Sequence, residues 1–179
     1  MIDLARQDLI DRLLALDEEA YLTFRDAERL HVVIVGGSAL VLMEYISRST
    51  HDIDALDVSV RLQGMLAQYD INCLVQTYIN NFPYNYEDRL RPLGLPTKLI
   101  DYYTASLEDI VVAKLYSARD KDILDITTPE VLEHIDWQLL QHLATDEGEA
   151  RASSLNDRRY SDFLANYTEY VKEYGPCKS

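Results

Sequence analysis

The feature that most constrains the fold is a β-branched run that stops at a pair of glycines. Residues Val32 to Val35 form the kind of short apolar run that is typical of a buried strand, and Gly36-Gly37 ends it. The apolar residues from Ala39 to Ile46 predict a helix directly after the turn. Glycine permits turns with positive φ and lets a ligand approach the backbone closely. We therefore expect a strand, a tight turn and a helix within an α+β protein.

Two carboxylates follow this helix. Asp52 and Asp54 are separated by one apolar residue, Ile53. In a strand, side chains two positions apart point to the same face, and the backbone rises about 3.3 Å per residue. The two carboxylates would then reach a common point while Ile53 enters the core. Such a pair suits Mg²⁺, which prefers oxygen ligands and shares them with substrate phosphates; the alternative is a solvated strand end.

The glycine turn supplies the other half of this predicted site. The N-terminus of a helix offers unpaired N–H groups and a partial positive charge, which favour phosphate. Ser38 is expected to cap the helix or to donate its hydroxyl to a phosphate oxygen. Arg48 is expected to pair with a phosphate or with an acidic side chain, and Thr50 to bind the nucleotide or only to hold the turn. The alternative for the glycines and Ser38 is a simple strand–helix turn with a cap.

A lysine stands in an unusual place further along the chain. Residues 107–118 predict an amphipathic helix with Ser106 as its N-cap, and Lys114 falls on the apolar stripe of that helix. A buried charge is costly without a partner, so Lys114 needs an ion pair or a shifted pKa. The alternative is a lysine at the edge of the core whose amine reaches solvent.

The same stripe continues toward two aspartates. Asp122 lies four residues beyond Ala118, and Asp125 follows one turn later. Both could instead pair with Arg119 or Lys121 on a helical surface.

Hydrophobic periodicity and turn residues predict the remaining elements. Helices are expected at residues 2–16, 18–30 (a second helix or an extension), 61–78, 131–134, 137–144 and 155–174, and strands at 89–93 and 97–104. Pro129 after Thr128 suits the first position of a helix. We expect one domain over residues 1–126 and a helical C-terminal extension over 127–179.

Composition restricts the function classes. The formal charge of −14 argues against a broad nucleic-acid-binding surface, which is usually basic, although a local basic cleft stays open. Cys73 and Cys177 are too few for a disulfide framework or a zinc site. The first residues lack a signal-peptide layout, and no apolar run reaches membrane-spanning length. We expect a soluble, cytoplasmic protein.

The motifs resemble those of a known superfamily. Gly36-Gly37-Ser38 followed by Asp52-Ile53-Asp54 resembles the signature of the nucleotidyltransferases, which include DNA polymerase β and the kanamycin nucleotidyltransferases. The fuller string, with Arg48 and Thr50, is similar to the AbiE-type toxin nucleotidyltransferases of abortive infection and their bacterial relatives. The resemblance runs from about Val32 to Asp125. It implies a mixed β-sheet flanked by helices.

The resemblance also implies a reaction. Such an enzyme transfers a nucleoside monophosphate from an NTP to an acceptor hydroxyl with Mg²⁺, and the acceptor would be RNA or protein. Asp52 and Asp54 would be catalytic and bind the metal, Lys114 would contact the nucleotide phosphates, and Asp122 would act as acid or base. Superfamily members carry a third carboxylate on a later strand; Asp88 is the candidate, although no Asp or Glu has a clear strand context for it.

Three functions therefore stay open. The first is a toxin-antitoxin or phage-defence nucleotidyltransferase with a cognate antitoxin or other partner protein. The second is a binding or regulatory protein that keeps the fold with weak or lost catalysis. The third is a nucleotidyltransferase of small molecules such as aminoglycosides.

Overall fold

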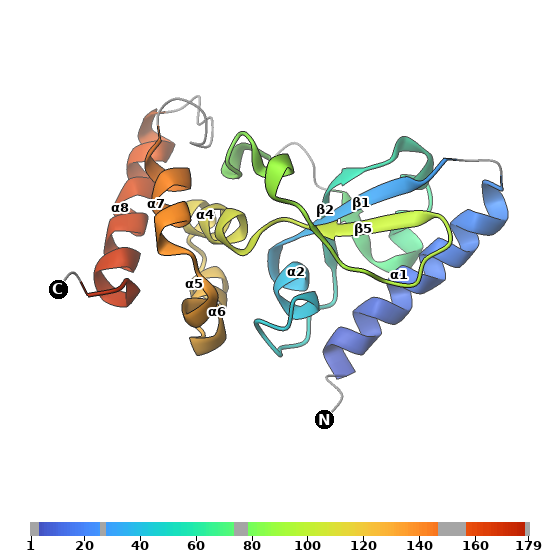
Figure 1. Ribbon diagram of the computed structural model, residues 1–179, viewed down its shortest axis with the longest axis horizontal. Coiled ribbons are helices and arrows are strands. Elements are labelled where there is room, and N and C mark those ends of the chain that lie inside the picture. Colours follow the sequence, from blue (N-terminus) through green and yellow to red (C-terminus); the bar gives the residue numbers. More distant parts are fainter. Residues whose placement is uncertain (1–3, 26–27, 74–78, 147–156, 178–179) are drawn as a thin grey trace. The chain divides into compact units, whose positions relative to one another are not determined.

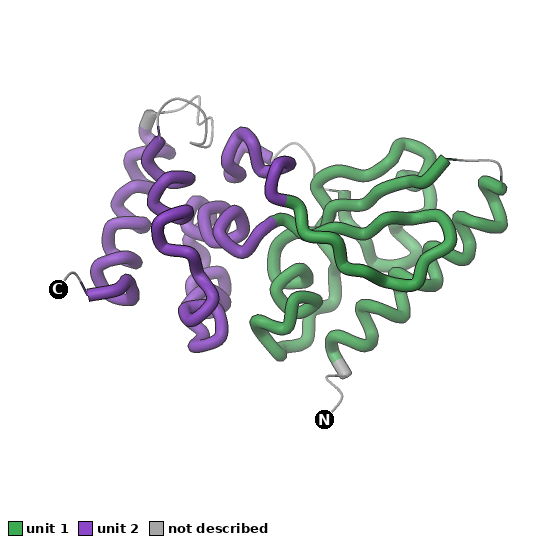
Figure 2. The backbone as a smooth tube through the Cα atoms, viewed as in Figure 1, with its two compact units in different colours: residues 1–75, 90–105 green, residues 76–89, 106–179 purple. Residues whose placement is uncertain are grey.

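The computed structural model describes residues 4–25, 28–73, 79–146 and 157–177 (Figure 1). It has a five-stranded mixed sheet and helices, which confirms the predicted α+β class. The chain divides into two compact units: unit 1 is Met1–Val75 with Leu90–Ala105, and unit 2 is Gln76–Arg89 with Ser106–Ser179 (Figure 2). The domain boundary between residues 126 and 127 stays a prediction.

Unit 1 contains the sheet, whose strand order is β3-β2-β1-β5-β4. The strands are β1 (Leu30–Val35), β2 (Ile53–Val58), β3 (Ile71–Cys73), β4 (Arg91–Pro92) and β5 (Ile100–Thr104). The central strand, β1, runs antiparallel to β2 and parallel to β5. The predicted apolar run is buried from Val32 to Val35, so both faces of this central strand are covered.

The described part of unit 1 includes two α-helices. The α1 helix (Leu4–Thr23) is continuous, so the second N-terminal segment is an extension that ends at Thr23. Its side chains Leu9, Leu13 and Leu16 are fully buried. The α2 helix (Gly36–Leu42) begins three residues earlier than predicted and ends before Glu44, which has a left-handed φ of 66°.

The helix predicted over residues 61–78 is wrong for its described part. Two short 3₁₀ turns, η1 (Val60–Leu62) and η2 (Leu66–Tyr69), precede β3. Leu62 and Leu66 are four residues apart and both are buried, which is the pattern that predicted a helix. In the structure two separate 3₁₀ turns bury them instead. Asp70 has a left-handed φ of 54° and turns the chain into β3. Residues 74–78 lie outside the described residues.

A buried carboxylate connects α1 to the start of β5. Asp17 is 3% exposed and accepts backbone N–H bonds from Lys98, Leu99 and Ile100 at 2.7, 2.9 and 2.7 Å. Buried backbone donors are expensive to leave without an acceptor. Asp17 therefore satisfies three donors that the sheet itself does not satisfy.

We expect Asp17→Ala to lower the free energy of unfolding by about 3 kcal/mol, since several buried donors would lose their acceptor. The neighbouring Glu18 is the matched control, because it pairs with Lys98 at a surface where both side chains are half exposed. Glu18→Ala should cost under about 1 kcal/mol. Urea unfolding of both variants measures the difference, and equal losses would contradict the role assigned to Asp17.

Unit 2 is helical. Its elements are η3 (Ile79–Asn81), η4 (Tyr86–Arg89), α4 (Leu107–Ser117), α5 (Asp120–Ile126), α6 (Pro129–His134), α7 (Trp137–Thr145) and α8 (Asp157–Tyr174). The α4 helix is buried from Leu107 to Leu115 because α5, α7 and α8 all pack against it. The predicted C-terminal helices are confirmed, except that residues 155 and 156 lie outside the described part of the chain.

Polar groups at the start of α4 confirm the predicted cap. Ser106 accepts the N–H of Asp109 at 3.1 Å, and its hydroxyl donates to the Asp109 carboxylate at 2.6 Å. The same carboxylate, fully buried, receives two bonds from the guanidinium of Arg89 at 2.7 and 3.0 Å. Thr128 and Pro129 begin α6 as expected.

Candidate functional site

The glycine turn at the end of β1 lies against the second predicted carboxylate. Gly36 has a left-handed φ of 67°, which other residues adopt only with strain. A β-carbon at this position would stand 3.3 Å from Asp54 Oδ2. Val35 and Asp54 are register partners of β1 and β2, which explains this approach. The structure therefore brings the predicted glycine turn and Asp54 together.

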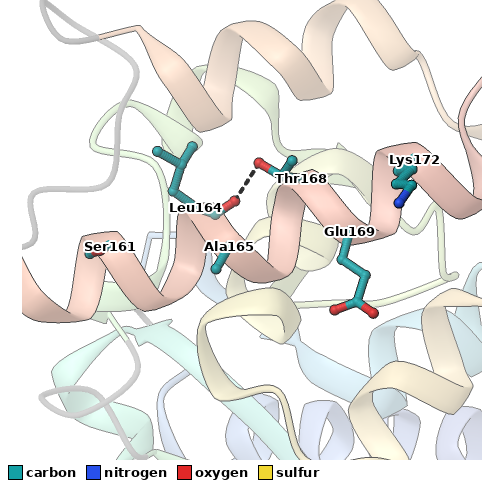
Figure 3. A pocket seen from close by; sticks show the side chains of 6 residues that line it. All are labelled: Ser161, Leu164, Ala165, Thr168, Glu169 and Lys172. Atoms are coloured by element: carbon teal, nitrogen blue, oxygen red, sulfur yellow. Dashed lines mark hydrogen bonds between the residues drawn. The ribbon is translucent and has the colours of Figure 1, made fainter.

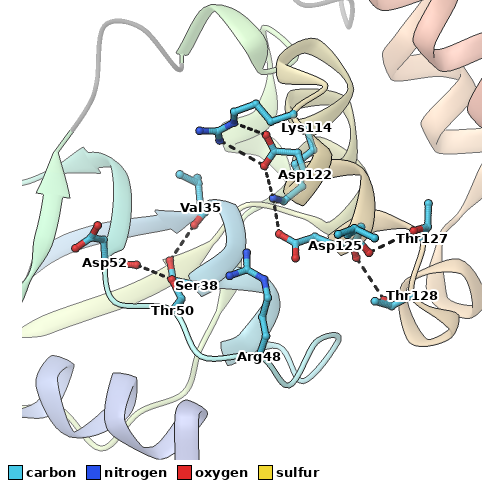
Figure 4. Close-up of polar contacts among 12 residues, drawn as sticks. Val35, Ser38, Arg48, Thr50, Asp52, Lys114, Asp122, Asp125, Thr127 and Thr128 are labelled. Atoms are coloured by element: carbon cyan, nitrogen blue, oxygen red, sulfur yellow. Dashed lines mark hydrogen bonds and ion pairs between the residues drawn. The ribbon is translucent and has the colours of Figure 1, made fainter.

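Ser38 joins the turn to β2. Its buried hydroxyl donates to the Val35 carbonyl at 3.0 Å (Figure 4). The same hydroxyl accepts the Asp54 N–H at 3.4 Å. The N-cap of α2 is Val35, without a side-chain bond, because the helix begins at Gly36. The predicted capping role of Ser38 is therefore wrong, and its alternative role toward phosphate stays a prediction.

Asp52 lies just outside the strand and is exposed, whereas Ile53 is fully buried as predicted. Thr50 donates its hydroxyl to the Asp52 carbonyl at 3.2 Å (Figure 4). Arg48 donates to the carbonyl of Ser49 at 3.4 Å. Thr50 thus holds the turn in front of Asp52, which was one of its two predicted roles.

The strand beside Asp54 presents an amide. In the parallel pairing of β2 with β3, Asn72 stands in register with Asp54.

Asp88, the candidate third carboxylate, is exposed on η4 of unit 2, where it lines a pocket of about 560 Å³ with Tyr84 and Tyr86. Among the described residues, no three His, Cys, Asp or Glu side chains are grouped to hold a metal ion. The oxygen donors of Asp52 and Asp54 suit a hard cation such as Mg²⁺.

Lys114 is the centre of a buried ion cluster in unit 2. It is 5% exposed, and its amine donates to Asp122 Oδ1 and Asp125 Oδ2, both at 2.8 Å (Figure 4). Arg119 donates to Asp122 Oδ2 at 2.6 Å. The expectation of a partner for Lys114 is confirmed, and the alternative of an amine that reaches solvent is wrong.

A chain reversal makes this cluster possible. Ala118 has a left-handed φ of 48° and ends α4, so α5 starts in a new direction at Asp120. Asp122 and Asp125 are 2% and 3% exposed. Both carboxylates are therefore buried, and the predicted pairing of Asp122 with Arg119 is confirmed, although only the arginine of that pair is exposed.

The cluster lowers the pKa of Asp122. Burial alone would raise it, but the hydrogen bonds and positive charges of Arg119 and Lys114 outweigh burial. The folded state then binds the Asp122 proton less tightly than the unfolded state does. The stabilisation is complete above the ordinary aspartate value of 3.8 and is lost as the pH falls below it toward the folded pKa.

We expect the difference in free energy of unfolding between the wild type and Asp122→Asn to shrink as the pH falls below about 3.8. Urea unfolding at a series of pH values measures it. A difference that stays constant down to pH 2.5 would contradict a charge-based role of Asp122.

A second pocket of unit 2 is lined by none of the predicted site residues. A shallow pocket along α8 is lined by Ser161, Leu164, Ala165, Thr168, Glu169 and Lys172 (Figure 3). Thr168 donates its hydroxyl to the Leu164 carbonyl there at 2.7 Å. This pocket offers no convergent set of reactive groups.

The mixed sheet, the glycine turn and the adjacent carboxylates define a nucleotidyltransferase-like fold. A family model described as "Nucleotidyltransferase of unknown function (DUF6036)" matches residues 11–175, and the chain belongs to this family. No curated protein and no solved structure matches the chain. Within the described residues, no helix is both long enough and apolar enough to cross a membrane.

Proposed function

We propose that this chain is a Mg²⁺-dependent nucleotidyltransferase that moves a nucleoside monophosphate from an NTP to an acceptor hydroxyl and releases pyrophosphate. The observation that carries the proposal is the Asp54 carboxylate against the Gly36 turn, with Asp52 two residues earlier. The family of the chain supports the same class of reaction.

Each residue has a proposed part. Asp52 and Asp54 would hold Mg²⁺, which when bound neutralises phosphate charge and favours attack at the α-phosphorus. The peptide N–H groups of Gly36 and Gly37 would bind phosphate oxygens. Ser38 keeps this turn on β2 through its bonds to Val35 and Asp54.

The roles of the unit 2 residues rest on the resemblance. Lys114 is proposed to contact nucleotide phosphates, and Asp122 to act as acid or base. In the structure Lys114 donates to two carboxylates. A phosphate contact would therefore require it to exchange one of these partners.

RNA or protein is the proposed acceptor, in a toxin-antitoxin or phage-defence setting. Because the net charge is −14, RNA would bind through a local basic patch, weakly and with a steep dependence on salt. The same charge favours a cationic acceptor such as an aminoglycoside, which is the small-molecule alternative.

A second candidate is a binding or regulatory protein with weak or lost catalysis. Asn72 favours it, because an amide instead of a carboxylate stands in register with Asp54. Two carboxylates give a divalent cation fewer charged oxygen ligands than the three that superfamily members carry.

Calorimetry separates these candidates. Each NTP is titrated with and without Mg²⁺ into the wild type, the Asp52→Asn/Asp54→Asn variant and the Asp57→Asn variant. Asp57 is the matched control, since it is a half-exposed carboxylate on the same strand that pairs with His31.

We expect micromolar, Mg²⁺-dependent binding that the double variant loses and Asp57→Asn keeps. Failure of every NTP to bind would overturn the proposal. Binding without turnover on RNA, protein or aminoglycoside acceptors would favour the regulatory candidate.

A further inference from the structure

An arginine of α1 reaches the segment that carries the first metal candidate. Arg12 donates through Nη1 to the carbonyl of His51, the residue before Asp52, at 2.8 Å. The same nitrogen lies 3.3 Å from the carbonyl of Tyr69. The Arg12 side chain is only 17% exposed. One guanidinium thus contacts two segments distant in sequence from α1.

These two segments enter neighbouring strands at the same end of the sheet. The β2 and β3 strands are parallel, with Ile53 and Ile71 in register, and the Ile53 N–H donates to the Asp70 carbonyl at 2.9 Å. Arg12 therefore bridges the entrances of both strands. Asp8 at 3.1 Å and Asp70 at 3.7 Å balance its charge.

The two candidate metal ligands differ in how firmly the backbone holds them. Asp54 lies inside β2, in register with Val35, and its N–H donates to Ser38. Asp52 precedes the strand and is exposed, so the sheet ladder does not hold it. Contacts from outside the strand therefore hold this segment, and they include the bond of Thr50 to the Asp52 carbonyl and the bond of Arg12 to the His51 carbonyl.

We propose that Arg12 is a positioning residue for Asp52: its bond to the His51 carbonyl fixes the peptide that carries the Asp52 carboxylate. This inference rests on the proposed metal-binding role of Asp52 and Asp54. Metal ligands must be held to within about 0.5 Å, and loss of a supporting residue costs about 10- to 100-fold in metal affinity. A planar guanidinium with several donors in a fixed fork suits this task.

The direction in which removal of Arg12 changes the affinity for a cation distinguishes a positioning role from a purely electrostatic one. Arg12 is a cation near the candidate ligands, so its removal should strengthen cation binding if only charge matters. Loss of positioning predicts the opposite, namely weaker binding. A purely structural role predicts lower stability with unchanged affinity of the folded protein.

The test measures Mn²⁺ binding to the apoprotein by electron paramagnetic resonance, well below the unfolding temperature of each variant. We compare the wild type, Arg12→Met, Arg12→Lys, Asp52→Asn and a matched control, Arg6→Met. Arg6 also lies on α1 and donates to a carbonyl, that of Leu42, at 3.0 Å. Circular dichroism reports the folded fraction of each variant.

We expect Arg12→Met to weaken Mn²⁺ binding at least about tenfold, Arg12→Lys to recover part of that loss, and Arg6→Met to stay within about twofold of the wild type. Unchanged or tighter binding by folded Arg12→Met overturns this inference alone. If Arg12→Met does not fold, Arg12→Lys carries the test, and wild-type affinity in that variant overturns it. No Mn²⁺ binding by the wild type, or no loss in Asp52→Asn, overturns the proposed metal site and the inference with it.

Discussion

Lys114→Met is expected to lower the free energy of unfolding by about 3–5 kcal/mol. Lys114 is buried and contacts Asp122 and Asp125. Removal of the amine leaves two buried carboxylates without that cation, and an uncompensated buried charge is strongly destabilising. Chemical unfolding at pH 7 measures the loss.

The variant Lys114→Met/Asp122→Asn/Asp125→Asn is the control for charge. It replaces the buried ions by neutral groups of similar size, so it should be more stable than Lys114→Met alone. The deficit of the single variant should also shrink in mild acid, because protonation of a carboxylate that has lost its cation removes a buried charge. A single variant that is as stable as the wild type would contradict the role of this cluster in the core.

The same pair of variants tests the nucleotide role of Lys114. If Lys114 only stabilises unit 2, the neutral triple variant should bind an NTP as the wild type does. If it also contacts phosphate, binding should stay impaired after stability recovers. Calorimetry on the folded triple variant distinguishes the two outcomes.

Gly36→Ala is expected to damage both stability and the candidate site. The left-handed φ of 67° would strain an alanine by about 1–2 kcal/mol. The new β-carbon would also stand 3.3 Å from Asp54 Oδ2, so the carboxylate has to shift. We expect Mg²⁺-dependent NTP binding to weaken at least about tenfold, since displaced ligands lose metal affinity.

Gly94→Ala separates these two causes. Gly94 has nearly the same φ, 64°, but an added β-carbon would meet nothing within 4 Å. Its variant should show the backbone strain without an effect on binding. Equal NTP affinities of the folded Gly36→Ala and Gly94→Ala variants would show that close approach to Asp54 has no functional consequence.

Several features of the candidate site could be predicted from local sequence patterns. The strand before Gly36, the turn, and the burial of Ile53 between two carboxylates follow from residue spacing and glycine chemistry. The caps at Ser106 and Thr128 follow in the same way, because a cap involves only neighbouring residues. The family to which the chain belongs is described as a nucleotidyltransferase family, in agreement with the class that these motifs predict.

Other features depend on long-range contacts. Residues 71–73 form an edge strand because β2 offers a pairing partner, which the apolar spacing over 61–78 does not reveal. Ser38 and Arg12 have bonding partners that are far from them in sequence or belong to another element. The exact start of α2 also depends on the Val35–Asp54 pairing that positions the turn.

By itself, the sequence determined the strand, glycine turn and paired aspartates, and it required a partner for a lysine on an apolar stripe. Only the tertiary structure decided which groups meet that requirement: a left-handed residue, Ala118, redirects the chain so that Asp122 and Asp125 reach Lys114. The physical reason is the different distance along the sequence over which these interactions act. Backbone preference and periodicity act over a few residues, whereas the neutralisation of a buried charge depends on whichever side chains the fold packs around it.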